Sequence, residues 1–459
     1  MPQCNAPQCN APKATTQDIV VKFEPKRYIS YIIKAVTASK NNKILPVDSD
    51  WHEMEDKLKN SDAVFVDDMT DIADDCSTVA LSSLPRSFSS MESMESMESM
   101  EDENDTTPYA FCYTNFNWLS ILGHGSFGTV FLTEYHYNNN NNNNNNNTKI
   151  KHKRPQFYAV KTLAKTRIEE GDMEQILFEK KILIELRSPF VLRFYGTCQS
   201  KDELYFVTEA LEHGDLFHAL YYGVRIDHAT CAFYAACILL GLDFIHSKNV
   251  VYRDLKPENI MIGANGYPKI IDFGLAKHIP YVKQSEDGIM RKFTKCHTLC
   301  GTPEYFAPEI IMKSGYDTAV DIWAMGVLIY EMIFRRTPFV NPDSTEDTYI
   351  LDMFTNVIVS YKHGVELPLK MDRKTDGTSN ARNLVTQLLS GHKIGRLGEY
   401  KTAAGLLQHP YFAGLYSAHE LYRQTIPAPT IPTKYSGRDI YPENYAEEYK
   451  GKQDRFIGF

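Results

Sequence analysis

The stretch YRDLKPEN, residues 252–259, places an acid, a lysine and an asparagine within six positions. In order they are Asp254, Lys256 and Asn259. A carboxylate can accept the proton of a hydroxyl, an ammonium can hold a phosphate, and amide and carboxylate oxygens can bind a hard metal ion. Because so short a string also arises by chance, it predicts a phosphate-handling site only if complementary segments flank it in order.

The segment GHGSFGTV, residues 123–130, lies between two apolar runs. It contains the glycines Gly123, Gly125 and Gly128. A glycine-rich hairpin lets the backbone approach a phosphate closely, although such turns are also common without a ligand. Further along, Lys161 in FYAVK is a cation in a β-rich run, and Glu179 in a helical stretch can pair with it. Taken singly, both would be ordinary surface residues.

Asp272 in IIDFGLAK, residues 270–277, follows two β-branched residues. Its carboxylate suits magnesium, which prefers oxygen ligands and nucleotide phosphates. With Asn259 as a second oxygen donor, the sequence predicts two magnesium positions. The string TLCGTPEYFAPE, residues 298–309, follows and ends in A-P-E. The elements occur in an order that chance does not explain.

The composition is that of a globular protein with an acidic N-terminal arm. Of 459 residues, 43% are hydrophobic and 23% charged, and the formal net charge is -9. Residues 1–110 carry 10 Lys and Arg against 20 Asp and Glu, which leaves 39 against 38 in the remainder. The near-neutral body argues against nucleic acid as the main partner.

Cysteine content and hydropathy predict a cytoplasmic or nuclear protein. The nine cysteines have no close paired spacing, which favours reduced thiols over a disulfide framework. The N-terminus has no apolar core of a signal peptide. The charge-free apolar stretch at 229–242 is too short to span a bilayer, so we expect a buried helix and no transmembrane segment.

Three segments follow one another along the chain. The arm at 1–110 contains the repeats PQCNA and MES and is predicted to be disordered. From about Phe116, short β-like runs precede long helical patterns that begin near residue 215, which predicts an α+β arrangement or two lobes. Ten asparagines at 138–147 interrupt two strand candidates. They predict a disordered loop, with an aggregation-prone or binding tract as the alternative.

Together these motifs resemble a eukaryotic Ser/Thr protein kinase of the AGC group. The resemblance covers a kinase domain at 116–412 and a C-terminal extension at 413–459. Tyr252 where the catalytic loop usually has His, the string TLCGTPEY and the terminal FIGF are most similar to cyclic-AMP- and cyclic-GMP-dependent kinases. The resemblance implies a bilobal kinase fold, with a small β-rich N-lobe, a larger helical C-lobe and an AGC tail whose FIGF docks on the small lobe.

The resemblance also implies ATP and Mg²⁺ as cofactors and assigns roles. Asp254 would orient the substrate hydroxyl and accept its proton, Lys256 would stabilise the transferring phosphate, and Thr302 would lie beside Asp254. Asn259 and Asp272 would hold magnesium. The implied ATP-binding residues are Gly123, Gly125, Ser126, Phe127, Gly128, Val130, Ala159, Lys161, Glu179, Thr208, Glu209 and Leu211.

Other family positions concern stability and activation. Glu309 and Arg396 resemble a buried ion pair, and Asp321 resembles the acid that braces the catalytic loop. Thr298 is the predicted activating phosphosite, where an activating kinase would add a phosphate that Arg253 and Lys277 can pair. The alternative is an ordinary loop threonine.

Three acidic residues predict the substrate, and the lack of a recognisable cyclic-nucleotide-binding domain predicts a partner. Asp215, Glu258 and Glu331 match positions that capture arginines, so substrates with Arg or Lys two and three residues before the target are predicted. No cyclic-nucleotide-binding domain is recognisable in 1–110, so a separate regulatory subunit is a hypothesis. The rival functions are another AGC kinase, a pseudokinase scaffold and, less compatible with the A-P-E segment, a metabolic nucleotide-binding enzyme.

The chain departs from the family in four places. The asparagine tract lengthens one strand connection, and residues 278–293 resemble an insertion before the phosphosite. Gln175 replaces a histidine that contacts the activation phosphate, which predicts weaker coupling to the helix that carries Glu179. The tail segment 441–449 only loosely resembles the stretch that closes over ATP.

Overall fold

In the computed structural model, the described residues are 111–125, 128–136, 156–169, 171–211, 213–223, 226–282, 292–293, 295–341, 343–345, 348–363, 377–397, 401–414, 417–431, 438–439 and 449–459. They belong to one of the two units into which the chain divides, the unit formed by 1–40 and 110–459. The predicted arm at 1–110 and the asparagine run at 138–147 lie outside the described residues.

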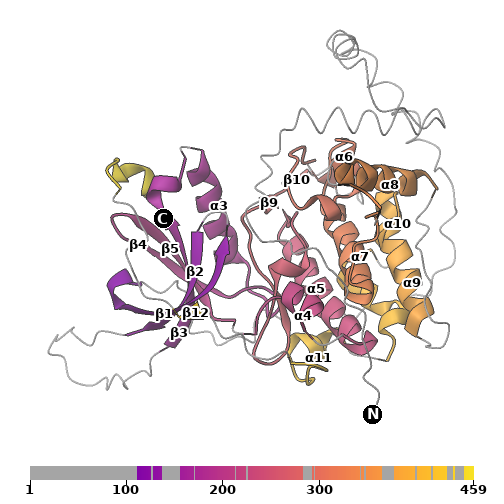
Figure 1. The fold of residues 1–459 in the computed structure, drawn as a ribbon, viewed down its shortest axis with the longest axis horizontal. Coiled ribbons are helices and arrows are strands. Elements are labelled where there is room, and N and C mark those ends of the chain that lie inside the picture. Colours follow the sequence, from indigo (N-terminus) through magenta and orange to yellow (C-terminus); the bar gives the residue numbers. More distant parts are fainter. Residues whose placement is uncertain are drawn as a thin grey trace, which may run out of the picture. The chain divides into compact units, whose positions relative to one another are not determined.

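The first part of this unit is an antiparallel sheet (Figure 1). Its strands are β1 (Phe116–Gly125), β2 (Gly128–Tyr135), β3 (Gln156–Ala164), β4 (Phe194–Gln199), β5 (Glu203–Glu209) and β12 (Arg438–Asp439). The spatial order is β12-β1-β2-β3-β5-β4. The short β-like runs of the sequence, WLSIL, TVFLTEY, FYAVKTL and YFVTEAL, are confirmed as β1, β2, β3 and β5. The sequence prediction missed β4, whose pairing with β5 is interrupted by a register shift between Phe194 and Gly196.

The two faces of the sheet bury different side chains. On one face, a core cluster consists of Phe116, Tyr135, Tyr158, Val160, Tyr205 and Val207. Side chains alternate along a strand, so Lys161 and Leu163 point to the opposite face. There, Leu163 and Phe206 pack in the same cluster as the buried residues of α3 (Asp172–Glu185). The sheet therefore presents Lys161 on the side of its helix.

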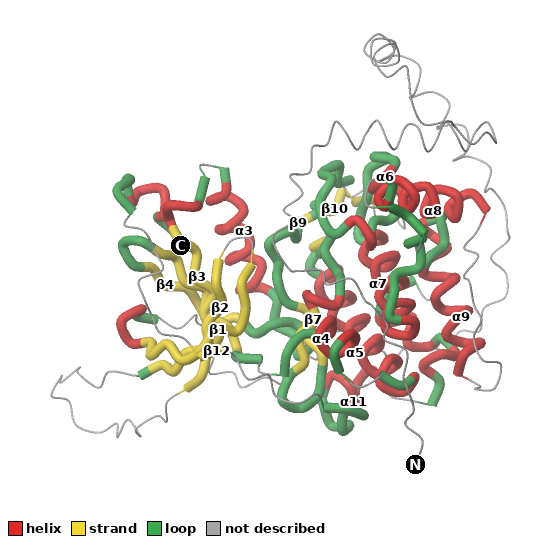
Figure 2. Tube along the Cα trace, viewed as in Figure 1, coloured by secondary structure: helices red, strands yellow, loops and turns green. Residues whose placement is uncertain are grey.

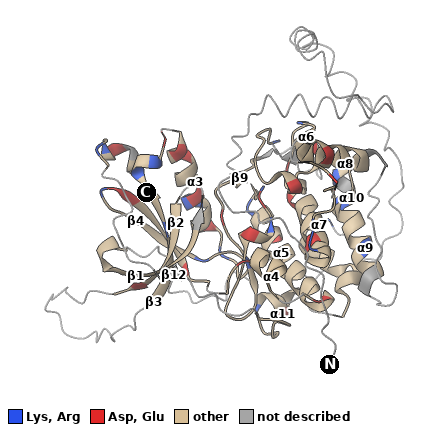
Figure 3. Cartoon of the chain, viewed as in Figure 1, with Lys and Arg blue, Asp and Glu red and all other residues tan. Residues whose placement is uncertain are grey.

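Helices dominate from residue 216 onward (Figure 2). They are α4 (Leu216–Tyr221), α5 (His228–Ser247), α6 (Pro308–Ile311), α7 (Ala319–Phe334), α8 (Tyr349–His363), α9 (Gly377–Leu388), α10 (Lys393–Leu397) and α11 (Ala418–Tyr422). This confirms the predicted α+β class. Basic and acidic residues are interspersed among the described elements (Figure 3).

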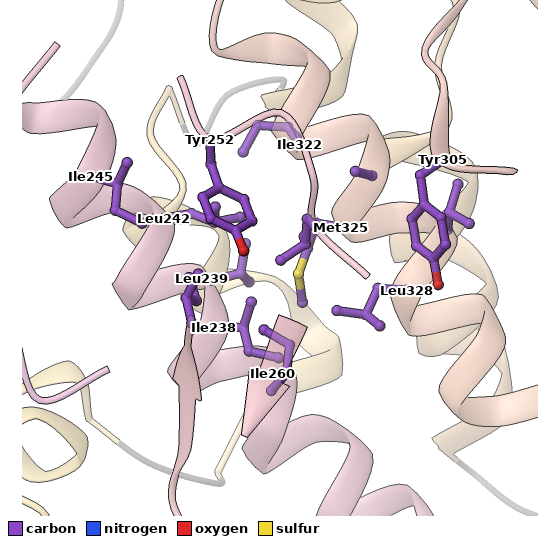
Figure 4. Close-up of a cluster of buried hydrophobic side chains, with 14 of the residues drawn as sticks. Ile238, Leu239, Leu242, Ile245, Tyr252, Ile260, Tyr305, Ile322, Met325 and Leu328 are labelled. Atoms are coloured by element: carbon purple, nitrogen blue, oxygen red, sulfur yellow. The ribbon is translucent and has the colours of Figure 1, made fainter. Parts of the chain in front are cut away.

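Helices α5 and α7 form the centre of the helical part. Figure 4 shows Leu242 from α5 and Ile322 and Met325 from α7 around the buried ring of Tyr252. The predicted buried helix is thus confirmed as α5. By length and composition α5 could cross a membrane, but 83% of its apolar window is buried inside the protein, as in the core helix of a folded domain.

Short strands flank the segments that contain the motifs at 252–259 and 270–277. They are β6 (Val250–Val251), β7 (Ile260–Ile262), β8 (Pro268–Ile270), β9 (Lys277–His278), β10 (Tyr281–Val282) and β11 (Lys292–Phe293). The pairs β6–β9, β7–β8 and β10–β11 are antiparallel. The catalytic loop therefore lies between β6 and β7, and Asp272 follows β8 closely.

Candidate active site

Asp321 on α7 fixes the catalytic loop. Its carboxylate accepts the backbone N–H of Tyr252 at 2.9 Å and that of Arg253 at 2.8 Å. The Nε2 atom of His246 lies 2.7 Å from the same carboxylate. Arg253 has a φ of 73°, a left-handed conformation that costs energy outside glycine. The bonds to Asp321 hold the loop in this strained shape.

Tyr252 connects the catalytic loop to the segment that carries Asp272. Its ring is buried and packs edge-to-face on Phe273, with 5.3 Å between centroids. Its hydroxyl donates a hydrogen bond to the carbonyl oxygen of Ile271. Burial raises the pKa of Tyr252, so the phenol stays protonated and remains a donor.

Asp254 lies at the centre of a hydrogen-bonded cluster. Thr302 Oγ1 donates to its Oδ1 atom at 2.8 Å, and Asn259 Nδ2 donates to its Oδ2 atom at 2.8 Å. Lys256 Nζ lies 2.9 Å from Oδ2 and donates to Thr302 Oγ1 at 3.0 Å. The structure thus brings the three predicted catalytic residues together and fixes the carboxylate in one orientation.

Asp272 and Asn259 are oxygen donors suited to a hard cation. The side chain of Asp272 is 50% exposed. The amide of Asn259 is oriented by two bonds from Nδ2, to the carbonyl and the carboxylate of Asp254. No group of three or more metal-ligating side chains occurs within the described part of the chain. A divalent ion would therefore rely on these two donors and on phosphate oxygens, which is the coordination that Mg²⁺ favours.

Lys161 on β3 forms the predicted ion pair with α3. Its Nζ atom lies 3.0 Å from Glu179 Oε1 and 4.0 Å from Asp272 Oδ1. Burial alone would lower the pKa of Lys161, but the carboxylates of Glu179 and Asp272 outweigh burial, and the pKa lies above its ordinary value. The lysine is therefore a permanent cation at neutral pH, available to a phosphate.

The glycine hairpin closes tightly against β3. Gly125 pairs with Gly128 across the turn. A Cβ atom at Gly128 would lie 1.8 Å from the backbone oxygen of Thr162, so only glycine fits between these strands. A Cβ at Gly123 would meet nothing within 4 Å, which leaves open space beside the hairpin. The predicted ATP-binding residues Ser126 and Phe127 lie outside the described residues.

Strands β2, β3 and β5 bring several of the predicted ATP-binding residues together. Val130 on β2 pairs with Lys161, and Ala159 on β3 pairs with Thr208 on β5. The Thr208 hydroxyl donates to the Ala159 carbonyl oxygen at 3.3 Å. Leu211 follows β5 and is buried. These predicted positions are therefore contiguous across the sheet.

The side chain of Glu209 is engaged within the protein. Its carboxylate lies 2.7 Å and 2.9 Å from Lys269 Nζ and also accepts the backbone N–H of Arg193 at 2.7 Å. A contact of Glu209 with ATP would therefore involve its backbone. No pattern in the sequence marked Lys269 as the partner of Glu209.

The side chain of Thr298, the predicted phosphosite, is exposed. Its carbonyl oxygen accepts the hydroxyl of Tyr316 at 2.6 Å, and Arg253 Nη1 donates to the same hydroxyl at 3.1 Å. Arg253 Nε also donates to the carbonyl oxygen of Leu275 at 2.6 Å. Tyr316 thus links the phosphosite backbone to Arg253, while Lys277 on β9 is exposed.

The three acids predicted to bind substrate lie near one another. Loss of hydration raises the pKa of Asp215, of Glu258 and of Glu331, and the charges of Glu331 and Asp215 add to the shift of Glu258. Asp215 also caps α4, because its Oδ1 atom accepts the backbone N–H of His218 at 2.6 Å. Glu258 is exposed, whereas Glu331 is only 5% exposed.

Gln175 makes a contact that its position in the sequence did not reveal. Its Nε2 atom donates to the carbonyl oxygen of Gly274 at 2.8 Å. This bond joins α3, which carries Glu179, to the segment just after Asp272. The helix is therefore coupled to the site through Gln175 itself.

The C-terminal segment docks beside the sheet through Lys165 and Phe456. Lys165 is almost fully buried and lies over the ring of Phe456, 4.5 Å from its centroid. Its Nζ atom donates to Gln453 Oε1 at 2.7 Å and to Gln199 Oε1 at 2.9 Å. Burial lowers the pKa of Lys165. Sequence reasoning missed this lysine, which lies four positions after Lys161.

Phe459 extends the docked tail toward the ion pair. Its ring meets that of Phe206 edge-to-face at 5.1 Å, and Lys180 on α3 donates to the Gly458 carbonyl oxygen at 2.9 Å. Lys161 Nζ lies 5.8 Å from the centroid of the same Phe206 ring. The FIGF terminus thus contacts both α3 and the sheet, as predicted.

The predicted structural ion pair is present and buried. Arg396 on α10 donates to both oxygens of Glu309 on α6, at 2.6 Å and 2.7 Å, and its guanidinium lies 5.1 Å from the centroid of the Trp323 ring. Arg396 also donates to the Ala319 carbonyl oxygen at 2.9 Å. The pair therefore connects α6, α7 and α10.

This combination of a lysine–glutamate pair, a braced catalytic loop and an acid after β8 defines a phosphotransferase site of the protein kinase type. In agreement, residues 116–412 match the protein kinase domain. The chain belongs to the protein kinase family, and its relatives confirm the predicted resemblance to the AGC group.

Three relatives illustrate the similarity. Over 353 residues, the chain is 33% identical to a cAMP-dependent protein kinase catalytic subunit of Arthrobotrys oligospora, which covers 75% of this chain and 60% of the relative. It is 33% identical over 338 residues to serine/threonine-protein kinase sgk-1 of Caenorhabditis elegans, covering 73% and 63%. It is 33% identical over 338 residues to cAMP-dependent protein kinase type 3 of Saccharomyces cerevisiae, covering 72% and 74%. The chain thus spans less than two thirds of the first two relatives.

Proposed function

We propose that this protein is a Ser/Thr protein kinase of the cyclic-nucleotide-dependent type, which transfers the γ-phosphate of ATP to a substrate hydroxyl. The observation that carries the proposal is the cluster around Asp254. Its carboxylate is oriented by Thr302 and Asn259 and lies 2.9 Å from the Lys256 ammonium. A pre-oriented base beside a cation suits phosphoryl transfer, in which positioning and charge stabilisation dominate.

Each residue has a role in this reaction. Asp254 orients the substrate hydroxyl and accepts its proton as the new O–P bond forms and the bond to the ADP leaving group breaks. Lys161, held by Glu179, binds nucleotide phosphates, and Lys256 stabilises the charge of the transferring group. Asn259 and Asp272 would hold Mg²⁺, which offsets phosphate charge when bound.

The proposed substrates carry basic residues two and three positions before the target. Asp215, Glu258 and Glu331 support this preference because they gather three carboxyls near the catalytic loop. A peptide-array profile without a basic preference would contradict it.

Regulation is proposed at two levels. An activating kinase would phosphorylate the exposed Thr298. A separate cyclic-nucleotide-binding subunit is proposed by analogy with the relatives named cAMP-dependent. We place the protein in the cytoplasm or nucleus, which its free described cysteines support. If the regulatory proposal is correct, a regulatory subunit inhibits the recombinant protein and cyclic nucleotide restores its activity.

The decisive experiment measures phosphate transfer from ATP and Mg²⁺ to an Arg-Arg-x-Ser peptide by the full chain. We expect the Asp254→Asn variant to lose about 10²- to 10⁴-fold in kcat, because the base is removed. The Asp343→Asn variant, which changes an exposed acid, serves as the matched control and should retain full activity. Absence of transfer by the wild-type protein, or equal activity of the two variants, would overturn the proposal.

A further inference from the structure

The carboxylate of Glu331 is held by two phenols. Tyr221 donates to its Oε1 atom at 2.6 Å, and Tyr305 donates to its Oε2 atom. Glu331 itself is 5% exposed. Within the described residues, no lysine, arginine or histidine forms an ion pair with it. Its hydrogen-bonding oxygens are thus satisfied while its charge is not matched.

A carboxylate in this setting suits a cation from outside the chain. Taking a charge out of water is costly unless donors or an opposite charge compensate. The two phenols supply donors but no positive charge. A guanidinium offers both, since its planar fork can bind a carboxylate that is already held in one orientation.

Helix α4 holds Tyr221 in place. Asp215, another of the predicted substrate acids, caps the start of this helix, and Tyr221 is its last residue. The Tyr221 ring packs against Phe217 with 4.7 Å between centroids. The next residue, Tyr222, is 73% exposed. One short helix therefore sets the positions of Asp215 and of the Glu331 donor.

We propose that Tyr221 is a specificity-determining positioning residue, which orients the carboxylate of Glu331 so that it receives a substrate arginine. This inference rests on the proposed kinase function and deepens it. Tyr305 shares the contact but belongs to the segment that also carries Thr302. Tyr221 comes from α4, which carries none of the residues assigned to phosphate transfer, so its removal tests recognition separately from chemistry.

The test uses the full-length protein with Tyr221→Phe, which removes the hydroxyl and keeps the ring. Three peptides are compared: one with two arginines before the serine, and two in which either arginine is replaced by alanine. The arginine that Glu331 receives is the one whose loss raises KM in the wild type but not in Glu331→Gln. We expect Tyr221→Phe to raise KM for the two-arginine peptide about tenfold, the factor for one hydrogen bond to a charged group.

Three further results decide the matter. In Tyr221→Phe, kcat should stay within about twofold. The peptide that lacks the arginine bound by Glu331 should show no change in KM. Tyr222→Phe, the exposed neighbour, should behave as wild type with every peptide. A similar rise in KM for all three peptides would indicate a merely structural role and overturn the inference, and so would an unchanged KM.

Binding separates this inference from the proposed reaction. Fluorescence anisotropy of labelled peptides with alanine in place of the target serine gives Kd without phosphate transfer. We expect the same arginine-dependent weakening, about tenfold, in Tyr221→Phe. If phosphate transfer is absent but the arginine-dependent loss of peptide affinity is observed, only the proposed function is contradicted. If transfer occurs but Tyr221→Phe binds all peptides as the wild type does, only the inference falls.

Discussion

At the scale of single residues, Lys161 is held between the carboxylates of Glu179 and Asp272. Two carboxylates raise its pKa against the effect of burial. A lysine whose folded-state pKa is raised contributes stability that is fully present below the unfolded pKa, 10.5, and is lost as pH rises through the folded value. The ion pair should therefore be insensitive to pH across the neutral range.

A Lys161→Met variant tests whether the stability that Lys161 contributes is lost only at high pH. We expect its deficit in unfolding free energy, relative to wild type, to stay constant from about pH 6 to about pH 9 and to shrink above the unfolded pKa of 10.5. Urea titrations of both proteins at each pH supply the measurement. Lys181→Met, on the exposed side of α3, is the matched control. A deficit that grows as pH rises would contradict the assignment.

Thr298 is the residue at which regulation is predicted. We expect Thr298→Ala to lose activity by about tenfold or more, since a phosphate there would form charge-assisted hydrogen bonds that alanine cannot. Peptide phosphorylation by protein that was incubated with an upstream kinase provides the measurement. Wild-type protein treated with phosphatase is the control and should fall to the level of the variant. Undiminished activity of Thr298→Ala would refute the switch.

Sequence reasoning identified residues that lie in short motifs or match positions of the kinase family, and it missed Tyr221 and Lys165, which have neither mark. Asp254 and Asn259 are five positions apart in one short string, and this string together with the motifs that flank it predicted a common site. Tyr221 and Glu331 are 110 positions apart, and Lys165 and Gln453 are 288 apart. Neither Tyr221 nor Lys165 lies in a recognisable string, so only the folded chain reveals its partner.

At the scale of elements, some strands could be predicted from the sequence and others could not. The β-branched and aromatic runs that became β1, β2, β3 and β5 were predictable from their local pattern. Strand β12 is only two residues long, and it exists because Ser120 and Ile121 on β1 present a sheet edge for it to pair with. No local pattern encodes such an element, because the partner strand creates it.

The docked C-terminal segment, residues 449–459, can be tested by substituting Phe456. Phe456 is 1% exposed, whereas its neighbour Ile457 is 76% exposed. We expect Phe456→Ala to undock residues 449–459, because losing a buried phenylalanine costs about 3–5 kcal/mol. Amide hydrogen exchange of this segment should speed up. Peptide phosphorylation should also fall several-fold, since Phe459 contacts the Phe206 ring that neighbours Lys161.

Ile457→Ala is the matched control for the tail. Its side chain is exposed, so exchange in 449–459 and activity should both remain at the wild-type level. If Phe456→Ala leaves exchange unchanged, the segment is held mainly by other contacts, such as the 2.7 Å bond between Lys165 and Gln453. If Phe456→Ala shows fast exchange but full activity, docking of the C-terminal segment is not needed for catalysis.

At the scale of the whole molecule, a few long-range contacts join elements that are distant in sequence. Glu309 and Arg396 are 87 positions apart and connect α6, which follows the phosphosite, to α10. A buried ion pair adds little stability compared with a well-packed apolar pair, but removing one partner leaves a charge stranded in the interior. Arg396 is fully buried, and Glu309 is 3% exposed.

Arg396→Met should therefore destabilise the protein more than the double variant does. We expect the single variant to lose about 3–5 kcal/mol of unfolding free energy, because Glu309 stays buried without a cation. The double variant Arg396→Met, Glu309→Leu removes both charges and should regain much of that loss. Urea unfolding of the wild type, both single variants and the double variant completes the cycle. If the double variant is no more stable than Arg396→Met, the pair acts through its other bonds, such as that to the Ala319 carbonyl, rather than through its charge.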